Sequence, residues 1–74
     1  MKITVKLFAT FRAGRFAVQM QDCAPGTRIA DVITALEIPE SEIGMIMLNN
    51  RHADPDHQLE EGANLSLFPL LGGG

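Results

Sequence analysis

LSLFPLLGGG, residues 65–74, joins a strand-like pattern to a run of three glycines. In its first part leucine alternates with Ser66 and Phe68, which predicts a β-strand with one buried face. Pro69 has no backbone N–H and therefore limits pairing beyond it. Ordering a glycine costs more conformational entropy than ordering any other residue. We therefore expect residues 70–74 to form a flexible tail that contributes nothing to the core.

The N-terminal end predicts two more strands. Residues 2–8 alternate between apolar and other side chains, and residues 16–21 do so again. Gly14 lies in the short connection between them and marks a reversal. Two alternating segments joined in this way are typical of a β-hairpin.

One helix is predicted after the turn at Pro25-Gly26. Thr27 is a plausible N-cap. The apolar residues that follow recur at the spacing of one helical face: Ile29, Val32, Ile33 and Leu36. Pro39 cannot continue a helix and favours extended geometry at the residue before it, so the helix should stop near Glu37.

The region between the helix and the last strand predicts two further strands. Residues 45–48 form a continuous apolar run, as expected of a central strand buried on both faces. Residues 51–54 fit a short edge strand, and Leu59 stands alone as an apolar anchor. The order strand, strand, helix, strand, short strand, strand predicts an α+β domain with a mixed four- to five-stranded sheet and one helix on one face. The expected core is Ile3, Val5, Leu7, Val18, Ile29, Val32, Ile33, Leu36, Leu59, Leu65 and Leu67.

Length and charge exclude several classes of protein. The 74 residues allow a single domain, 1–74, and the one cysteine allows no intrachain disulfide. The net charge is −3 and the six basic residues are scattered, which argues against nucleic-acid binding. No apolar run is long enough to cross a membrane, and the N-terminus has no signal core. We expect a cytoplasmic protein.

Metal and thiol chemistry are both disfavoured. His52, Asp54, Asp56 and His57 are close in sequence, but their spacing matches no familiar metal site and the aspartates fit a turn around a proline. Cys23 has an acidic neighbour in sequence, which does not activate a thiolate, so we expect a passive thiol. One cysteine also excludes a plant-type iron–sulfur ferredoxin, which needs four cysteine ligands. No bound metal or cofactor is expected.

The order of elements resembles that of the MoaD/ThiS family of ubiquitin-like sulfur carriers. The likeness spans essentially the whole chain and includes Leu59 followed by Glu61-Gly62, the strand ending in Phe68-Pro69, and the glycine-only terminus. It implies a β-grasp fold. It further implies a protein that is not itself an enzyme: a partner related to ubiquitin-activating enzymes uses ATP to join the terminal glycine to AMP. Sulfur transfer then gives a thiocarboxylate.

The resemblance assigns the chemistry to three residues. Gly74 would carry the reacting carboxylate, and Gly73 and Gly72 would form a narrow shaft leading to it. A second partner would accept the sulfur, either an enzyme like the molybdopterin synthase large subunit or one like thiazole synthase. The free chain is expected to be a monomer.

The sequence departs from the family pattern in three places. It ends in three glycines where two are typical, and Phe68-Pro69 is followed by two leucines where molybdopterin-type members often have a second proline. Gly62-Ala63-Asn64 replaces a frequent Gly-Asp.

A ubiquitin-like modifier, or an interaction module, would use the same terminal glycine, and a plain interaction domain would leave it inert. Analysis of the reaction products distinguishes a sulfur carrier from a modifier, because a carrier regenerates its free C-terminus and a modifier stays attached to its target.

The alternation also predicts where a partner binds. If the leucines of the first and last strands face the helix, their phenylalanines face the other way, and so do the methionines of the middle strand. Nothing else in the sequence can cover that face, because there is one helix. Exposed apolar patches of this kind mark binding sites. The predicted partner-binding residues are Phe8, Met45, Met47, Phe68, Pro69, Leu70 and Leu71.

Overall fold

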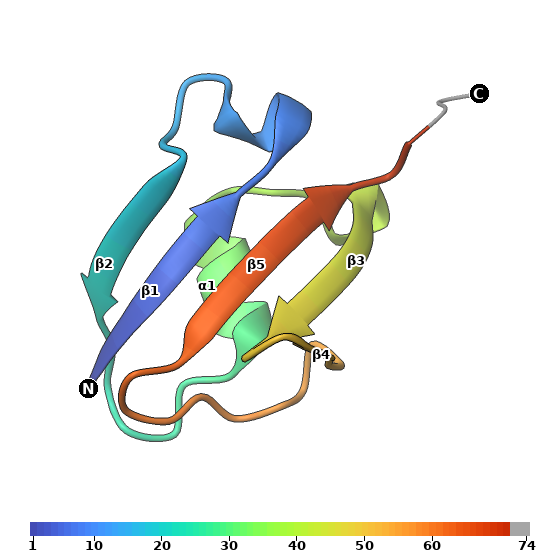
Figure 1. Cartoon of the computed structure of the whole chain (residues 1–74). Coiled ribbons are helices and arrows are strands. Elements are labelled where there is room, and N and C mark those ends of the chain that lie inside the picture. Colours follow the sequence, from blue (N-terminus) through green and yellow to red (C-terminus); the bar gives the residue numbers. More distant parts are fainter. Residues whose placement is uncertain (72–74) are drawn as a thin grey trace.

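The computed structural model describes residues 1–71 (Figure 1). The elements, in chain order, are β1 (Lys2–Leu7), the 3₁₀ turn η1 (Ala9–Arg12), β2 (Val18–Asp22), α1 (Ile29–Ala35), the 3₁₀ turn η2 (Glu40–Glu42), β3 (Ile43–Leu48), β4 (Arg51–His52) and β5 (Asn64–Pro69).

The strands form one mixed sheet in the order β2-β1-β5-β3-β4. β1 and β5 run parallel at its centre, and the other three neighbouring pairs are antiparallel. Helix α1 lies across one face of the sheet (Figure 1). The predicted α+β class, with a mixed sheet and one helix on one face, is confirmed.

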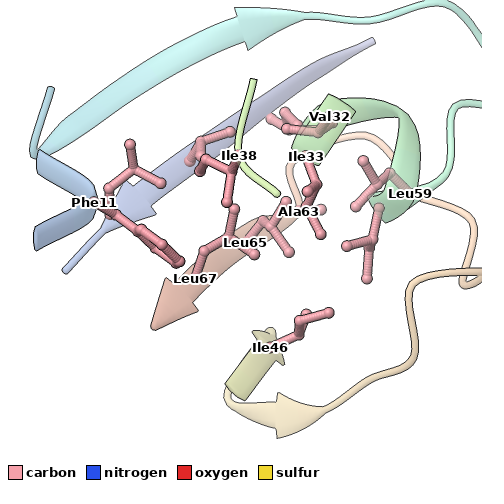
Figure 2. Packing of buried hydrophobic residues seen from close by; sticks show 13 residues of the cluster. Phe11, Val32, Ile33, Ile38, Ile46, Leu59, Ala63, Leu65 and Leu67 are labelled. Carbon is pink, nitrogen blue, oxygen red and sulfur yellow. The ribbon is translucent and has the colours of Figure 1, made fainter. Parts of the chain in front are cut away.

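The core lies between that helix and the central strands (Figure 2). β1 and β5 bury every second residue, so Val5, Leu7, Leu65 and Leu67 are fully buried there. Ile29, Val32 and Ile33 meet them from α1, and Leu59 closes one end. The alternating and helical patterns of the sequence identified these positions correctly.

The prediction for Val18 is wrong. Its side chain is 58% exposed. The antiparallel register pairs Val18 with Lys6, which places both on the face away from α1, while Gln19 pairs with the buried Val5. The alternation of β2 was identified correctly but its face was inverted. The glutamines take the helix side because β2 is an edge strand, where that face is only partly covered.

The helix is shorter than predicted. Arg28, not Thr27, is the N-cap, and the Thr27 hydroxyl instead donates a hydrogen bond to the Ala24 carbonyl at 2.7 Å. The Asp31 carboxylate accepts a hydrogen bond from the Arg28 backbone N–H at 2.9 Å, which satisfies one free donor at the helix start. Leu36 is the C-cap and is half-buried, so it packs against the core and does not lie fully within it.

Four buried residues were missing from the expected core. Phe11, on η1, is 3% exposed and fills the end of the core beyond β1 (Figure 2). The segment around it was interpreted only as a reversal. Ile38, Ile46 and Ala63 are also buried. Arg15 fixes this end of the molecule, because its guanidinium donates to the carbonyls of Phe11, Leu36 and Glu37 at 3.1–3.3 Å.

Replacing Ile33 by alanine should lower the free energy of unfolding by about 2–5 kcal/mol, because it removes a fully packed side chain and leaves a cavity. The fold is expected to persist, with an earlier urea midpoint measured by circular dichroism. Thr34→Ala, one position along on the exposed side of α1, is the matched control and should change stability little. Equal midpoints for Ile33→Ala and wild type would contradict this packing.

Candidate functional site

The face of the sheet opposite α1 carries a cluster of large apolar side chains. The parallel register pairs Leu7 with Leu67, so the next residues, Phe8 and Phe68, lie side by side on the uncovered face. The antiparallel register then pairs Phe68 with Met45. Three separate elements thus contribute to one apolar row.

The two phenylalanine rings stack on each other. Their centroids are 4.2 Å apart and their planes differ by 13°. Both residues are half-buried, as are Met45 and Met47. Met47 lies in the neighbouring row, where it pairs with Ser66. The structure therefore places all four predicted residues on the open face; whether a partner binds them remains a prediction.

A shallow groove adjoins these rings. Its volume is about 320 Å³ and its lining is mostly apolar. The groove lies where β5 ends and the C-terminal segment begins. Its lining residues are Phe8, Ala9, Gly44, Met45, Phe68, Pro69, Leu70 and Leu71. Six of the seven predicted partner-binding residues line this one groove; the seventh, Met47, lies beside it.

The start of the C-terminal segment is held against β3. The backbone N–H of Leu70 donates to the carbonyl of Glu42 at 3.0 Å. Gly44 makes the close approach possible, because a Cβ at that position would lie 2.6 Å from the carbonyl oxygen of Pro69. Pro69 is buried, whereas Leu70 and Leu71 are 62% and 85% exposed. The chain therefore leaves the sheet at a fixed point and carries two exposed leucines away from it.

Sequence reasoning missed two residues of this region. Gly44 appeared only as part of a polar connector, and its role depends on a contact with a residue far along the chain. Arg12 lies beside the groove: its Nε donates to the Leu7 carbonyl at 2.8 Å, and its guanidinium carbon is 5.5 Å from the centre of the Phe8 ring. The guanidinium supplies a positive charge at the rim of an otherwise apolar surface.

The remaining candidates lie apart from this groove or outside the described residues. Gly72, Gly73 and Gly74 fall outside the part of the chain that the structure describes. Within residues 1–71, no three His, Cys, Asp or Glu side chains are grouped so that they could hold a metal ion. Cys23 is half-buried and packs against the core.

Neither α1 nor either 3₁₀ turn in residues 1–71 is long and apolar enough to cross a membrane.

Comparison with known families agrees with this geometry. The sequence model of the ThiS family matches residues 5–74, nearly the whole chain. The chain belongs to the ThiS family. Its members are small ubiquitin-like sulfur carriers related to MoaD. The resemblance stated from the sequence is thereby confirmed. Among curated proteins, none matches the chain.

Solved structures confirm the β-grasp fold. A protein of Pyrococcus furiosus named as molybdopterin converting factor subunit 1 is 27% identical, with a TM-score of 0.77 over 93% of this chain and 97% of its own. The small archaeal modifier protein 1 of Haloferax volcanii is 22% identical, with a TM-score of 0.73 over 92% and 95%. A chain from the complex of subunits 1 and 2 of the molybdopterin-converting factor of Helicobacter pylori is 20% identical, with a TM-score of 0.68 over the full length of both. The last two show the shared fold.

Gly44→Ala should displace the start of the C-terminal segment, because the new methyl group would collide with backbone atoms of Pro69 and Leu70. We expect a large change in the amide chemical shift of Leu70 in an NMR spectrum, together with lower stability.

Gly14→Ala is the matched control for this variant. Gly14 has a φ of +70° but open space around it, so alanine there introduces backbone strain and no collision. It should lower stability while leaving the Leu70 amide in place. If Gly44→Ala leaves that amide unshifted, the contact does not position the segment.

Proposed function

We propose that the chain is a sulfur carrier whose C-terminal carboxylate, on Gly74, is adenylated and then converted to a thiocarboxylate. Membership of the ThiS family supports this proposal, and so does the site geometry. β5 ends, and the C-terminal segment begins, at a fixed point beside an apolar groove. That placement would let an enzyme hold the domain by its surface while the terminus enters the enzyme's own active site.

The chemistry requires activation because a carboxylate is anionic and resonance-stabilised. One of its oxygens attacks the α-phosphorus of ATP, and pyrophosphate leaves. The product is a mixed anhydride of Gly74 and AMP. A hydrosulfide-level sulfur nucleophile then attacks the glycyl carbon, the bond from carbon to the phosphate oxygen breaks, and AMP leaves. The carrier ends as a thiocarboxylate, and ATP is consumed by the activating enzyme.

A glycine-only terminus suits this chemistry. Gly72, Gly73 and Gly74 have no Cβ atoms, so this segment is as narrow as a polypeptide can be and can pass close to another backbone. No side chain adjoins the terminal carbonyl to obstruct nucleophilic attack. The chain itself supplies no catalytic group to the reaction, so the activating partner must supply all of them.

The proposed partners are an adenylating enzyme related to ubiquitin-activating enzymes and a sulfur-acceptor enzyme. The Helicobacter pylori protein, whose solved complex joins subunit 1 to subunit 2 of the molybdopterin-converting factor, supports an acceptor of that kind. The alternative acceptor is a thiazole synthase, in keeping with the thiamin branch of the family. With either acceptor, the proposed reaction takes place in the cytoplasm. The likeness to the small archaeal modifier protein keeps protein modification as the second candidate.

Deleting Gly74, or adding one residue after it, should abolish adenylation and leave the fold unchanged. The reason is that the terminal α-carboxylate would then belong to a different residue, one position short of or one position beyond Gly74. The measurement is acyl-adenylate formation with the activating enzyme and ATP, followed by intact-mass detection of the thiocarboxylate. Thr34→Ala, on the far side of α1, should behave as wild type. An extended variant that is adenylated at the wild-type rate would exclude the proposal.

Truncating the apolar surface should weaken partner binding. Phe68→Ala removes one ring of the stack and Met47→Ala shortens a neighbouring side chain. Each should cost more than about 1 kcal/mol in affinity for the activating enzyme, measured by calorimetry, while circular dichroism confirms the fold. Thr34→Ala again serves as the control. If both variants bind as wild type does, the C-terminal segment alone makes the interface.

A further inference from the structure

The two edges of the sheet differ in how well they are protected. β4 forms one edge and is only two residues long. Short edge strands are a common device against unwanted strand pairing. β2 forms the other edge and is five residues long, with the sequence VQMQD. It contains no proline, lysine or arginine, and its one charge is at its end.

The pairing of β2 with β1 fixes which backbone groups remain free. The N–H of Leu7 donates to the carbonyl of Ala17 at 2.9 Å, and the N–H of Cys23 donates to the carbonyl of Met1 at 2.7 Å. Hydrogen-bonded and non-bonded positions alternate in an antiparallel pair. The odd-numbered residues of β2 therefore face β1, and the even-numbered ones direct their N–H and C=O groups outward: Val18, Met20 and Asp22.

The exposed side chains of this edge lie outside the groove described above. Val18 is 58% exposed and Met20 is 67% exposed. Val18 is separated from the Met47 position by Lys6 and Ser66, which occupy the intervening strands of the same row. The groove beside β5 thus leaves these two large apolar side chains without a role.

We propose that β2 pairs with β2 of a second copy of this chain, antiparallel and centred on Met20. In this register Val18 lies opposite Asp22 of the second copy, and Met20 lies opposite Met20. Every outward N–H and C=O of both strands then has a partner. Shifting the register by two residues leaves the groups at one end of each strand unpaired, so the centred register is preferred.

The side chains are complementary in the same register. Two methionines meet on the open face, and Gln19 lies opposite Gln21 of the second copy on the other face, where each amide can both donate and accept. Lys6 pairs with Val18 and therefore occupies the next position along the row from Asp22 of the second copy. The only charged residue of β2, Asp22, lies opposite Val18 of the second copy and near its Lys6. The proposed interface therefore places no like charges opposite each other.

The resulting dimer is weak and reversible, because one short strand from each copy supplies a small interface. The free chain, expected from its sequence to be a monomer, would then be in a monomer–dimer equilibrium. The groove lies at the end of β5, and β1 separates β5 from β2 in the sheet (Figure 1), so both grooves stay open in the dimer. This inference does not depend on the proposed sulfur chemistry.

Sedimentation equilibrium from about 10 μM to about 1 mM tests the association, since a weak dimer reveals itself by mass action. The wild-type mass should rise with concentration. Met20→Lys puts two positive charges opposite each other at the two-fold axis and should weaken dimerisation by about ten-fold or more. Thr34→Lys adds the same charge on the exposed side of α1 and should dimerise as wild type does, with circular dichroism verifying both folds.

Amide chemical shifts over the same concentration series locate the interface. The N–H signals of Val18, Met20 and Asp22 should move with concentration, and those of Gln19 and Gln21 should move less. A wild-type mass that stays monomeric throughout overturns the proposal. A dimer that persists in Met20→Lys also overturns it. If the dimer persists in Met20→Lys but is lost in Phe68→Ala, the contact lies at the groove instead.

Discussion

The parallel pairing of β1 with β5 is the constraint on which the rest of the molecule depends. These strands are far apart in sequence yet form the centre of the sheet, and Val5, Leu7, Leu65 and Leu67 are fully buried on their helix side. Side chains alternate between the two faces of a strand, so burying these residues fixes the direction of all the others. A shift by one residue would expose the core and bury the polar side chains of both strands.

The same register builds the apolar surface on the opposite face. Once Leu7 and Leu67 are paired beneath α1, Phe8 and Phe68 must meet above the sheet, where their rings stack. The stability of the domain and the shape of the groove therefore come from one register and cannot be varied independently. Gly44 adds the last requirement, because only a residue without a side chain lets β3 lie against Pro69.

Much of this arrangement was predictable, because alternation and helical spacing record which residues share a face. The buried faces of β1, β5 and α1 follow from their patterns, as does the grouping of Phe8 with Phe68. The predictions that failed concern features that the local sequence pattern does not determine. The alternation of β2 is compatible with either face, and pairing with β1 placed Val18 outside. The roles of Phe11 and Gly44 depend on contacts distant in sequence, which spacing does not record.

The fold covers one face of its sheet and leaves the other open, and this asymmetry suits the proposed carrier, whose reaction would take place in the active site of another protein. A single helix is sufficient to close a core for a chain of 74 residues, and the uncovered face then provides a surface at no further cost in chain length. The groove lies beside the point where β5 ends, so in the proposed function binding at the surface and delivery of the terminus would be mechanically linked. An enzyme that bound the stacked rings would also fix the position from which the glycine segment starts. The number of residues between that position and Gly74 would then set how far the carboxylate can reach, so the length of the segment would matter to recognition as much as the groove does.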